Sequence, residues 1–263
     1  MLQLNRDNYH SLEADNYCMS RSSYLNFLTC EAKEVARLAG KWSEEKSDAL
    51  LVGSYVHAWC EGRREEFKVG CPEMFTKKGE IRSTFQSADK MIETLEQDEL
   101  AVMMLQGEKE VIITAEFAGA MWKVMLDVRN AQRRRNVDLK TTKSIREKVW
   151  SPVHEAKISF IEQYKYPFQA AIYSEIERLA AGRPEYDWYK FYIVAVSKEA
   201  TPDKEIIEMH DPERYIRELE SVRACMPRIL KVKAGEIEPI RCEQCAYCRS
   251  TRKLKRAVHY SEI

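Results

Sequence analysis

Two carboxylates and a lysine stand at a spacing that could hydrolyse a phosphodiester bond. Asp138 and Lys140 lie two residues apart in a β-rich segment, so they share one face of a strand while Leu139 turns to the core. Asp127 ends the preceding strand, and carboxylates on neighbouring strands can share a hard cation such as Mg²⁺. Such a cation activates a water molecule, which a lysine can orient or deprotonate. The simpler interpretation of Asp138 and Lys140 alone is a surface salt bridge.

Two helical segments carry further candidate site residues. Gln169 and Tyr173 are four residues apart, so they lie together on one helix flank and could hold a lysine, a water or a phosphate. Gly53 and His57 share a face in the same way, and His57 could ligate a metal through a ring nitrogen. A glycine inside a helix costs about 1 kcal/mol, which suggests a close approach at Gly53. The alternatives are a half-exposed flank for the first pair and a structural histidine for the second.

Cysteines form a second candidate site. Cys242, Cys245 and Cys248 fall within seven residues, a spacing that indicates metal ligation rather than disulfides. A closed tetrahedral zinc site or a four-iron cluster needs a fourth ligand, for which Cys30 is the first candidate and Cys18 the alternative. The competing interpretation is a set of free thiols. The remaining cysteines are expected to be small buried hydrophobic residues: Cys60, Cys71 and Cys225.

Basic residues could contact a nucleic-acid backbone, although a solvated protein surface explains them equally well. One run occupies the turn between the two carboxylate-bearing strands, and the other follows the cysteines: Arg133, Arg134 and Arg135, then Arg249, Arg252 and Lys253. The 42 Lys and Arg residues balance 42 Asp and Glu residues, which argues against a polycationic nucleic-acid coat. A local basic groove beside an acidic metal site remains compatible with this balance.

The elements that must position these residues follow from the hydrophobic periodicity. Helices are expected over 22–39, 47–61 with Ser47 as N-cap, and 84–106. Strands over 111–117, 121–129 and 137–141 predict an antiparallel meander. A helix follows Pro167, strands follow over 189–197 and 205–209, and a last helix runs from Asp211-Pro212 to about Lys233. This order predicts an α/β fold with a mixed sheet.

The ordered motifs resemble those of PD-(D/E)XK nucleases of the RecB/lambda-exonuclease branch. Phage- and prophage-borne RecE-like (exodeoxyribonuclease VIII-like) exonucleases are similar around DLKTTKSI, YPFQAAIY, YIVAVSKEATPDKEII and CEQCAYCRSTRKL. The likeness covers nearly the whole chain. Many relatives have a glycine two or three positions before the second-motif aspartate, where this chain has Val124 and Met125.

The resemblance implies a restriction-endonuclease-like α/β (α+β) core, with a mixed central sheet flanked by helices. It implies that His57, Asp127, Asp138 and the Leu139 carbonyl hold Mg²⁺ or Mn²⁺, and that Lys140 is the catalytic lysine. Gln169 and Tyr173 would support the site and the DNA. The expected organisation is a nuclease domain over 1–241, with a motif core over about 53–209, and a basic cysteine-bearing tail over 242–263 packed on that domain.

The implied activity is a Mg²⁺-dependent 5′→3′ exonuclease on duplex DNA ends, acting in recombination. Alternatives are a single-strand or structure-specific endonuclease, a non-catalytic DNA-binding recombination module, and a metal-bearing regulatory protein. Some RecB-family nucleases hold a [4Fe–4S] cluster through one cysteine before the core and three after it, so Cys30, Cys242, Cys245 and Cys248 would hold a cluster or Zn²⁺. A single-strand annealing recombinase is an expected partner, and rings of identical subunits are known among relatives. No apolar run or signal segment predicts a membrane or secreted protein, so a cytoplasmic location is expected.

Overall fold

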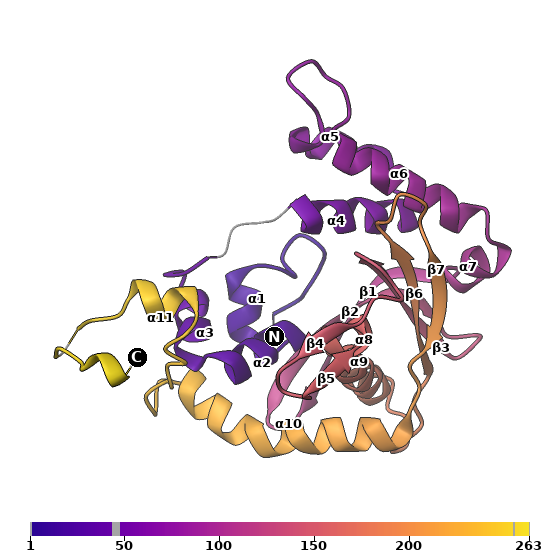
Figure 1. The fold of residues 1–263 in the computed structure, drawn as a ribbon. Coiled ribbons are helices and arrows are strands. Elements are labelled where there is room, and N and C mark those ends of the chain that lie inside the picture. Colours follow the sequence, from indigo (N-terminus) through magenta and orange to yellow (C-terminus); the bar gives the residue numbers. More distant parts are fainter. Residues whose placement is uncertain (1, 44–47, 255, 263) are drawn as a thin grey trace. The chain divides into compact units, whose positions relative to one another are not determined.

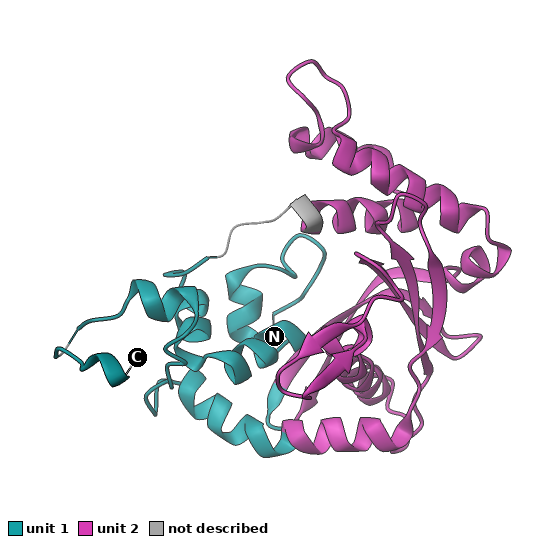
Figure 2. Ribbon diagram, viewed as in Figure 1, with its two compact units in different colours: residues 1–44, 118–120, 223–263 teal, residues 45–117, 121–222 magenta. Residues whose placement is uncertain are grey.

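The computed structural model describes residues 2–43, 48–254 and 256–262, so the predicted N-cap Ser47 lies outside the described residues. The chain divides into two compact units (Figure 2). Unit 1 comprises Met1–Glu44, Ala118–Ala120 and Arg223–Ile263, and unit 2 comprises Glu45–Phe117 and Met121–Val222. The predicted division between 1–241 and 242–263 stays a prediction.

A five-stranded sheet forms the centre of unit 2 (Figure 1). Its order is β1 (Glu108–Phe117), β2 (Ala120–Asn130), β3 (Arg135–Thr142), β6 (Lys190–Ser197) and β7 (Lys204–Glu208). β2 pairs antiparallel with β3, β3 pairs parallel with β6 from Arg135↔Lys190 to Thr142↔Ser197, and β6 pairs antiparallel with β7. The predicted mixed sheet is therefore confirmed, with the apolar strand β6 inside it.

Helices pack on this sheet (Figure 1). α4 (Asp48–Cys60) contacts β3, α6 (Ser83–Glu96) contacts β6, and α9 (Tyr166–Ala180) contacts β1 and β6. Leu139 joins Val137 and Val194 in one buried cluster with α4 and α6. Because side chains alternate along a strand, Asp138 and Lys140 point to the opposite face, where α9 supplies Gln169.

Shorter elements complete unit 2. They are α5 (Arg64–Gly70), η1 (Pro72–Met74), α7 (Glu99–Met104), α8 (Phe160–Gln163) and a small antiparallel hairpin of β4 (Val149–Ser151) and β5 (Ala156–Ile158). The hairpin was not predicted, because its strands are three residues each. The helix expected over 84–106 is interrupted, since Asp98 caps α7 by accepting a hydrogen bond from the Ala101 N–H.

Unit 1 is helical. It contains α1 (Leu12–Tyr17), α2 (Arg21–Thr29), α3 (Glu31–Leu38), the part of α10 (Pro212–Lys233) from Arg223 onward, α11 (Ala246–Ser250) and η2 (Tyr260–Glu262). The prediction of one helix over 22–39 is wrong, because Cys30 is extended, with φ −164° and ψ 103°. Glu34 of α3 accepts hydrogen bonds from Ser23 and Asn26 of α2, so the two helices are tied together across this break.

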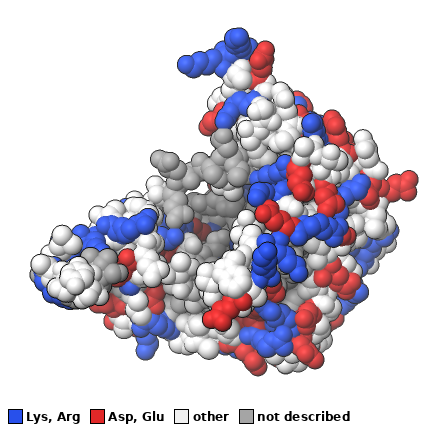
Figure 3. Space-filling model, in the orientation of Figure 1, with Lys and Arg blue, Asp and Glu red and all other residues white. Residues whose placement is uncertain are grey.

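The surface carries interspersed charges, and the face in Figure 3 shows cationic and anionic side chains next to each other over unit 2. Many of them are paired, such as Arg146 with Asp203 and Glu205, and Lys190 with Glu208. This agrees with the balanced composition. Within the described residues, no helix combines the length and apolar character needed to cross a membrane.

Gly107 lies just before β1 at a position that has no room for a side chain. Its φ is +150°, and a Cβ there would lie 2.5 Å from the Arg129 carbonyl oxygen. We expect Gly107→Ala to lower the free energy of unfolding by about 2 kcal/mol, because backbone must move to relieve the clash. Urea denaturation followed by circular dichroism measures this loss. Gly70→Ala is the control, since nothing lies within 4 Å of that Cβ; equal midpoints for the two variants would contradict the steric argument.

Candidate active site

Asp127 marks the point where β2 and β3 stop pairing as strands. Their paired residues run from Asn130↔Arg135 to Val128↔Val137, and at the next step Asp127 Oδ2 accepts a hydrogen bond from the Leu139 N–H at 2.8 Å. A side chain thus takes the place of a strand–strand hydrogen bond. The N–H and C=O of one residue in an extended strand point to the same side. The Leu139 carbonyl therefore leaves β3 on the edge that faces Asp127.

Asp138 is buried, with 3% of its surface exposed, and both carboxylate oxygens have a partner. Lys140 Nζ lies 2.6 Å from Oδ2, and Gln169 Nε2 donates to Oδ1 at 2.7 Å. Gln169 sits in the first turn of α9, which begins after Lys165 in a left-handed conformation and has Pro167 near its start. The structure therefore brings Asp138, Lys140 and Gln169 together across strand and helix.

His57 reaches this site from α4. Its Nδ1 lies 3.4 Å from Asp127 Oδ2. The expected close approach at Gly53 is not needed for this geometry, because a Cβ there would meet Thr141 Oγ1 at 3.5 Å, an ordinary van der Waals contact. The buried apolar face of α4 includes Val52, Tyr55 and Val56.

The charges of the site are set by burial and by one another. Burial lowers the pKa of His57, but the Asp127 carboxylate outweighs it, so this pKa lies above its ordinary value. Burial raises the pKa of Asp127, and His57 reverses this shift. The pKa of Asp138 is raised, first by burial and also by the negative charge of Asp127, against the opposing effect of Lys140. Burial also opposes the charge of Lys140, yet Asp138 and Asp127 raise its pKa well above the ordinary value.

The donor set here fits a hard divalent cation. Two carboxylates and a backbone carbonyl are oxygen ligands that suit Mg²⁺ and Mn²⁺, and the imidazole of His57 lies beside them. These candidate ligands lie further apart than the cysteines. Among the described residues, the four cysteines are the group of His, Cys, Asp or Glu side chains whose ligand atoms all lie within 4.8 Å of one another. In the structure, Lys140 rather than a second ligand pairs with Asp138 Oδ2.

Two tyrosines on α9 differ in their relation to the site. Tyr173, predicted to support it, packs its ring edge-on against Phe191 of β6 at 6.3 Å between centroids. Tyr166 was missed by the sequence analysis, although Lys140 Nζ lies 5.3 Å from the centroid of its ring. Its place three residues before Gln169 is the signal that could have indicated it.

The predicted DNA-binding basic residues are divided between the two units. Arg135 is buried, and its guanidinium donates to the Met103 and Met104 carbonyl oxygens, so it fastens α7 to the sheet instead of facing solvent. Arg134 is exposed and pairs with Asp187, and Arg133 is exposed on the same turn. In unit 1, Arg249, Arg252 and Lys253 are exposed. The DNA contacts of these five exposed residues stay predictions, and for Arg135 the structure shows a structural role.

The four cysteines Cys30, Cys242, Cys245 and Cys248 meet in unit 1, which confirms their predicted proximity. Cys18, the alternative fourth member, lies outside this group. Backbone N–H groups of Gln244 and Cys245 lower the pKa of Cys242 to about 6.

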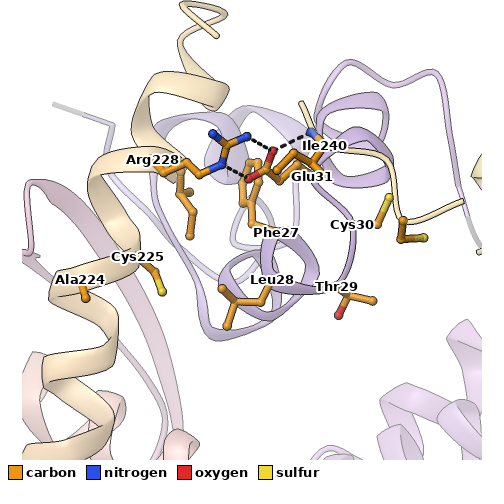
Figure 4. Close-up of a pocket in the computed structure, with 11 residues that line it drawn as sticks. Phe27, Leu28, Thr29, Cys30, Glu31, Ala224, Cys225, Arg228 and Ile240 are labelled. Carbon is orange, nitrogen blue, oxygen red and sulfur yellow. Dashed lines mark hydrogen bonds and ion pairs between the residues drawn. The ribbon is translucent and has the colours of Figure 1, made fainter. Parts of the chain in front are cut away.

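The other cysteines were predicted to be buried. Cys71 is buried, but Cys60 and Cys225 are half-buried. Cys225 lines a cavity of about 370 Å³ that Cys30 and Cys242 also line (Figure 4).

Adjacent strands that present Asp127, Asp138 and Lys140 to a glutamine-bearing helix define a nuclease of the PD-(D/E)XK type. The chain belongs to the family described as a PDDEXK-like domain of unknown function (DUF3799), whose model matches residues 20–251. This confirms the predicted superfamily.

A solved structure supports the same conclusion. The chain is 38% identical to a candidate exonuclease from Eubacterium rectale, with a TM-score of 0.92 over 100% of this chain and 98% of that one. A second structure, SSO0001, matches at 15% identity and a TM-score of 0.27 over 83% of this chain and 91% of that one, and carries no argument. A comparison with the curated proteins finds none that is similar. The similarity to the E. rectale structure confirms the predicted restriction-endonuclease-like core.

Proposed function

We propose that the chain is a divalent-metal-dependent deoxyribonuclease that degrades duplex DNA from its ends in the 5′→3′ direction. The observation that carries the proposal is the convergence of Asp127, Asp138, Lys140 and Gln169 at one place on the sheet. The exonuclease assignment draws on the resemblance to RecE-like enzymes and on the similarity to the E. rectale protein. DNA ends are thus the proposed substrate, and a single-strand annealing recombinase is the proposed partner.

Mg²⁺ or Mn²⁺, when bound, would lower the pKa of a water molecule and stabilise negative charge on the phosphate. His57, Asp127, Asp138 and the Leu139 carbonyl would hold the metal. Gln169 fixes the orientation of Asp138 by donating to Oδ1, so a bound cation would share Oδ2 with the Lys140 ammonium, which lies 2.6 Å from it. The Asp127 carboxylate is fixed in the same way by the Leu139 N–H.

Lys140 has a narrower role in this proposal than a general base. Its two carboxylate neighbours raise its pKa, so the ammonium stays protonated at neutral pH. A protonated lysine cannot take a proton from water, but it can donate a hydrogen bond to the water or to the phosphate. Lys140 therefore orients the nucleophile or stabilises the charge that develops as the water oxygen bonds to phosphorus and the P–O bond to the leaving group breaks.

Digestion of matched DNA substrates tests the proposed activity. Linear duplex labelled at one 5′ or one 3′ end, covalently closed circles and single strands are incubated with Mg²⁺, Mn²⁺ or EDTA. We expect metal-dependent loss of linear duplex with early release of the 5′ label, and intact closed circles. Cleavage of closed circles would favour the endonuclease alternative. DNA binding without cleavage in any metal would favour the non-catalytic recombination module.

His57→Ala is expected to weaken Mn²⁺ binding by about 10-fold or more, because an imidazole ligand is lost. Stability should change by less than about 1 kcal/mol, since Val52, Tyr55 and Val56 supply the buried face of α4. Calorimetric Mn²⁺ titration and thermal unfolding measure the two effects separately. His154→Ala, at an exposed histidine in the β4–β5 turn, is the matched control. A large loss of stability with unchanged Mn²⁺ affinity would make His57 a structural residue.

A further inference from the structure

The four clustered cysteines are arranged more tightly than a cubane iron–sulfur cluster requires. Cys30 Sγ lies 3.6 Å from Cys248 Sγ, and Cys242 Sγ lies 3.9 Å from Cys248 Sγ. All four sulfurs lie within 4.8 Å of one another. These separations are far above the ~2.05 Å of a disulfide, so the cysteines are not joined covalently.

The sulfur–sulfur separation distinguishes two kinds of metal centre. Four thiolates bound tetrahedrally to one ion at a Zn–S length of about 2.3 Å lie about 3.8 Å from each other. In a [4Fe–4S] cluster each cysteine binds a different iron at the corner of a cube, which separates the thiolate sulfurs to roughly 6 Å. The separations in the structure match the first geometry and are too short for the second. We propose that Cys30, Cys242, Cys245 and Cys248 form a mononuclear Zn²⁺ site, and not an iron–sulfur cluster.

Backbone hydrogen bonds to the sulfurs support metal-bound thiolates. The Cys245 N–H donates to Cys242 Sγ at 3.3 Å, and the Cys248 N–H donates to Cys245 Sγ at 3.4 Å. One Zn²⁺ with four thiolates carries a net charge of −2, which such hydrogen bonds and a nearby cation offset. Arg241 lies at this site: its guanidinium donates to the Cys248 carbonyl oxygen at 2.9 Å and also pairs with Glu243 at 2.9 Å, so the backbone N–H groups provide most of the offset.

Hydrogen bonds within unit 1 also join the two segments that carry the cysteines. The Ile240 N–H donates to Glu31 at 2.7 Å, the Ala32 N–H donates to the Ile240 carbonyl at 3.1 Å, and Arg228 forms two hydrogen bonds with Glu31 (Figure 4). These contacts place Ile240, which precedes Arg241, beside Glu31, which follows Cys30. The break between α2 and α3 then allows Cys30 to leave the helical path and join Cys248, and both are almost fully buried.

The site is structural rather than catalytic. Four protein ligands fill a tetrahedral ion, whereas a catalytic zinc keeps one position for water or substrate. The ion would link residues more than two hundred positions apart, which lowers the conformational entropy of the unfolded chain. This inference concerns unit 1 alone and is independent of the proposed nuclease activity.

Metal analysis of the purified full-length chain tests the proposal. The protein is produced with both iron and zinc in the medium, purified with and without oxygen, and measured by mass spectrometry for metals and by a sulfide assay. We expect about one zinc per chain, no acid-labile sulfide and no absorption near 400 nm. Exchange with Co²⁺ should give the d–d bands of a tetrahedral Co–thiolate site between about 600 and 750 nm.

Two serine variants test whether zinc binding depends on the four clustered cysteines. Cys242→Ser and Cys245→Ser, both at half-buried positions, should each lose most of the zinc. Cys225→Ser is the matched control, because this cysteine lines the adjacent cavity but lies outside the group of four, and it should keep one zinc per chain. Iron and sulfide near four per chain after anaerobic purification would overturn the proposal, and so would protein that holds no metal under either condition.

Discussion

If the proposed nuclease site is right, Asp138→Ala is expected to lower Mg²⁺-dependent DNA cleavage by about 100-fold or more, because it removes both a proposed metal ligand and the ion-pair partner of Lys140. Asp138 Oδ2 lies 2.6 Å from Lys140 Nζ, and its other oxygen accepts from Gln169. Without the carboxylate, the lysine loses its nearest anion, and the glutamine loses its acceptor. Initial rates on end-labelled linear duplex measure the loss.

Lys140→Ala should have a comparable effect, since it removes the ammonium proposed to act on the water or the phosphate while Asp138 remains. Asp203→Ala is the control, because Asp203 forms an ion pair with Arg146 near the surface. This variant should retain near-wild-type cleavage rates. Circular dichroism establishes that each variant is folded. Near-full activity of folded Asp138→Ala would sink the assignment of the site.

Glu175→Ala should lower the free energy of unfolding by about 3–5 kcal/mol, because it leaves a buried charge without its partner. Glu175 is 3% exposed. It accepts two hydrogen bonds from Arg178, both at 2.9 Å, and one from the indole N–H of Trp188 at 2.8 Å. Denaturation by urea, followed by circular dichroism, measures the change. Glu175→Gln should lose less, because it keeps the volume and one oxygen acceptor.

Glu147→Ala provides the contrast with an exposed ion pair. Glu147 pairs with Lys143 at 3.1 Å, but their side chains are 52% and 87% exposed. Solvent screens such a pair, so the expected loss is below about 1 kcal/mol. Equal losses for Glu147→Ala and Glu175→Ala would show that burial does not determine how much these carboxylates contribute to the free energy of unfolding.

The strands and the polar positions of the site were predictable because they depend on short sequence intervals. Alternation places Trp122, Val124, Leu126 and Val128 on one buried face, as expected. The spacing of Asp138 and Lys140 fixes their common side of β3. The approach of His57 and Gln169 came from ordered motifs rather than from periodicity, since no local pattern specifies a contact between distant segments.

The remaining differences involve tertiary contacts that override local preference. The periodicity of residues 22–39 is helical throughout, yet Cys30 is extended, where its sulfur meets three cysteines from the tail. Arg135 belongs to a basic run but lies under α7, because its guanidinium satisfies two carbonyl oxygens there. Neither contact leaves a signal within a few residues of the position concerned.

The parallel pairing of β3 with β6 has a consequence for the order in which the protein folds. Asp127 and Asp138 lie on neighbouring strands joined by a short turn, so their segment can form early by local contacts. Arg135 pairs with Lys190 only after the chain between them closes as a long loop. Closing such a loop costs entropy before any contact offsets it, so this step should come late. Truncating Val194 in β6 should therefore speed unfolding and leave the refolding rate nearly unchanged, whereas truncating Val137 should slow refolding as well.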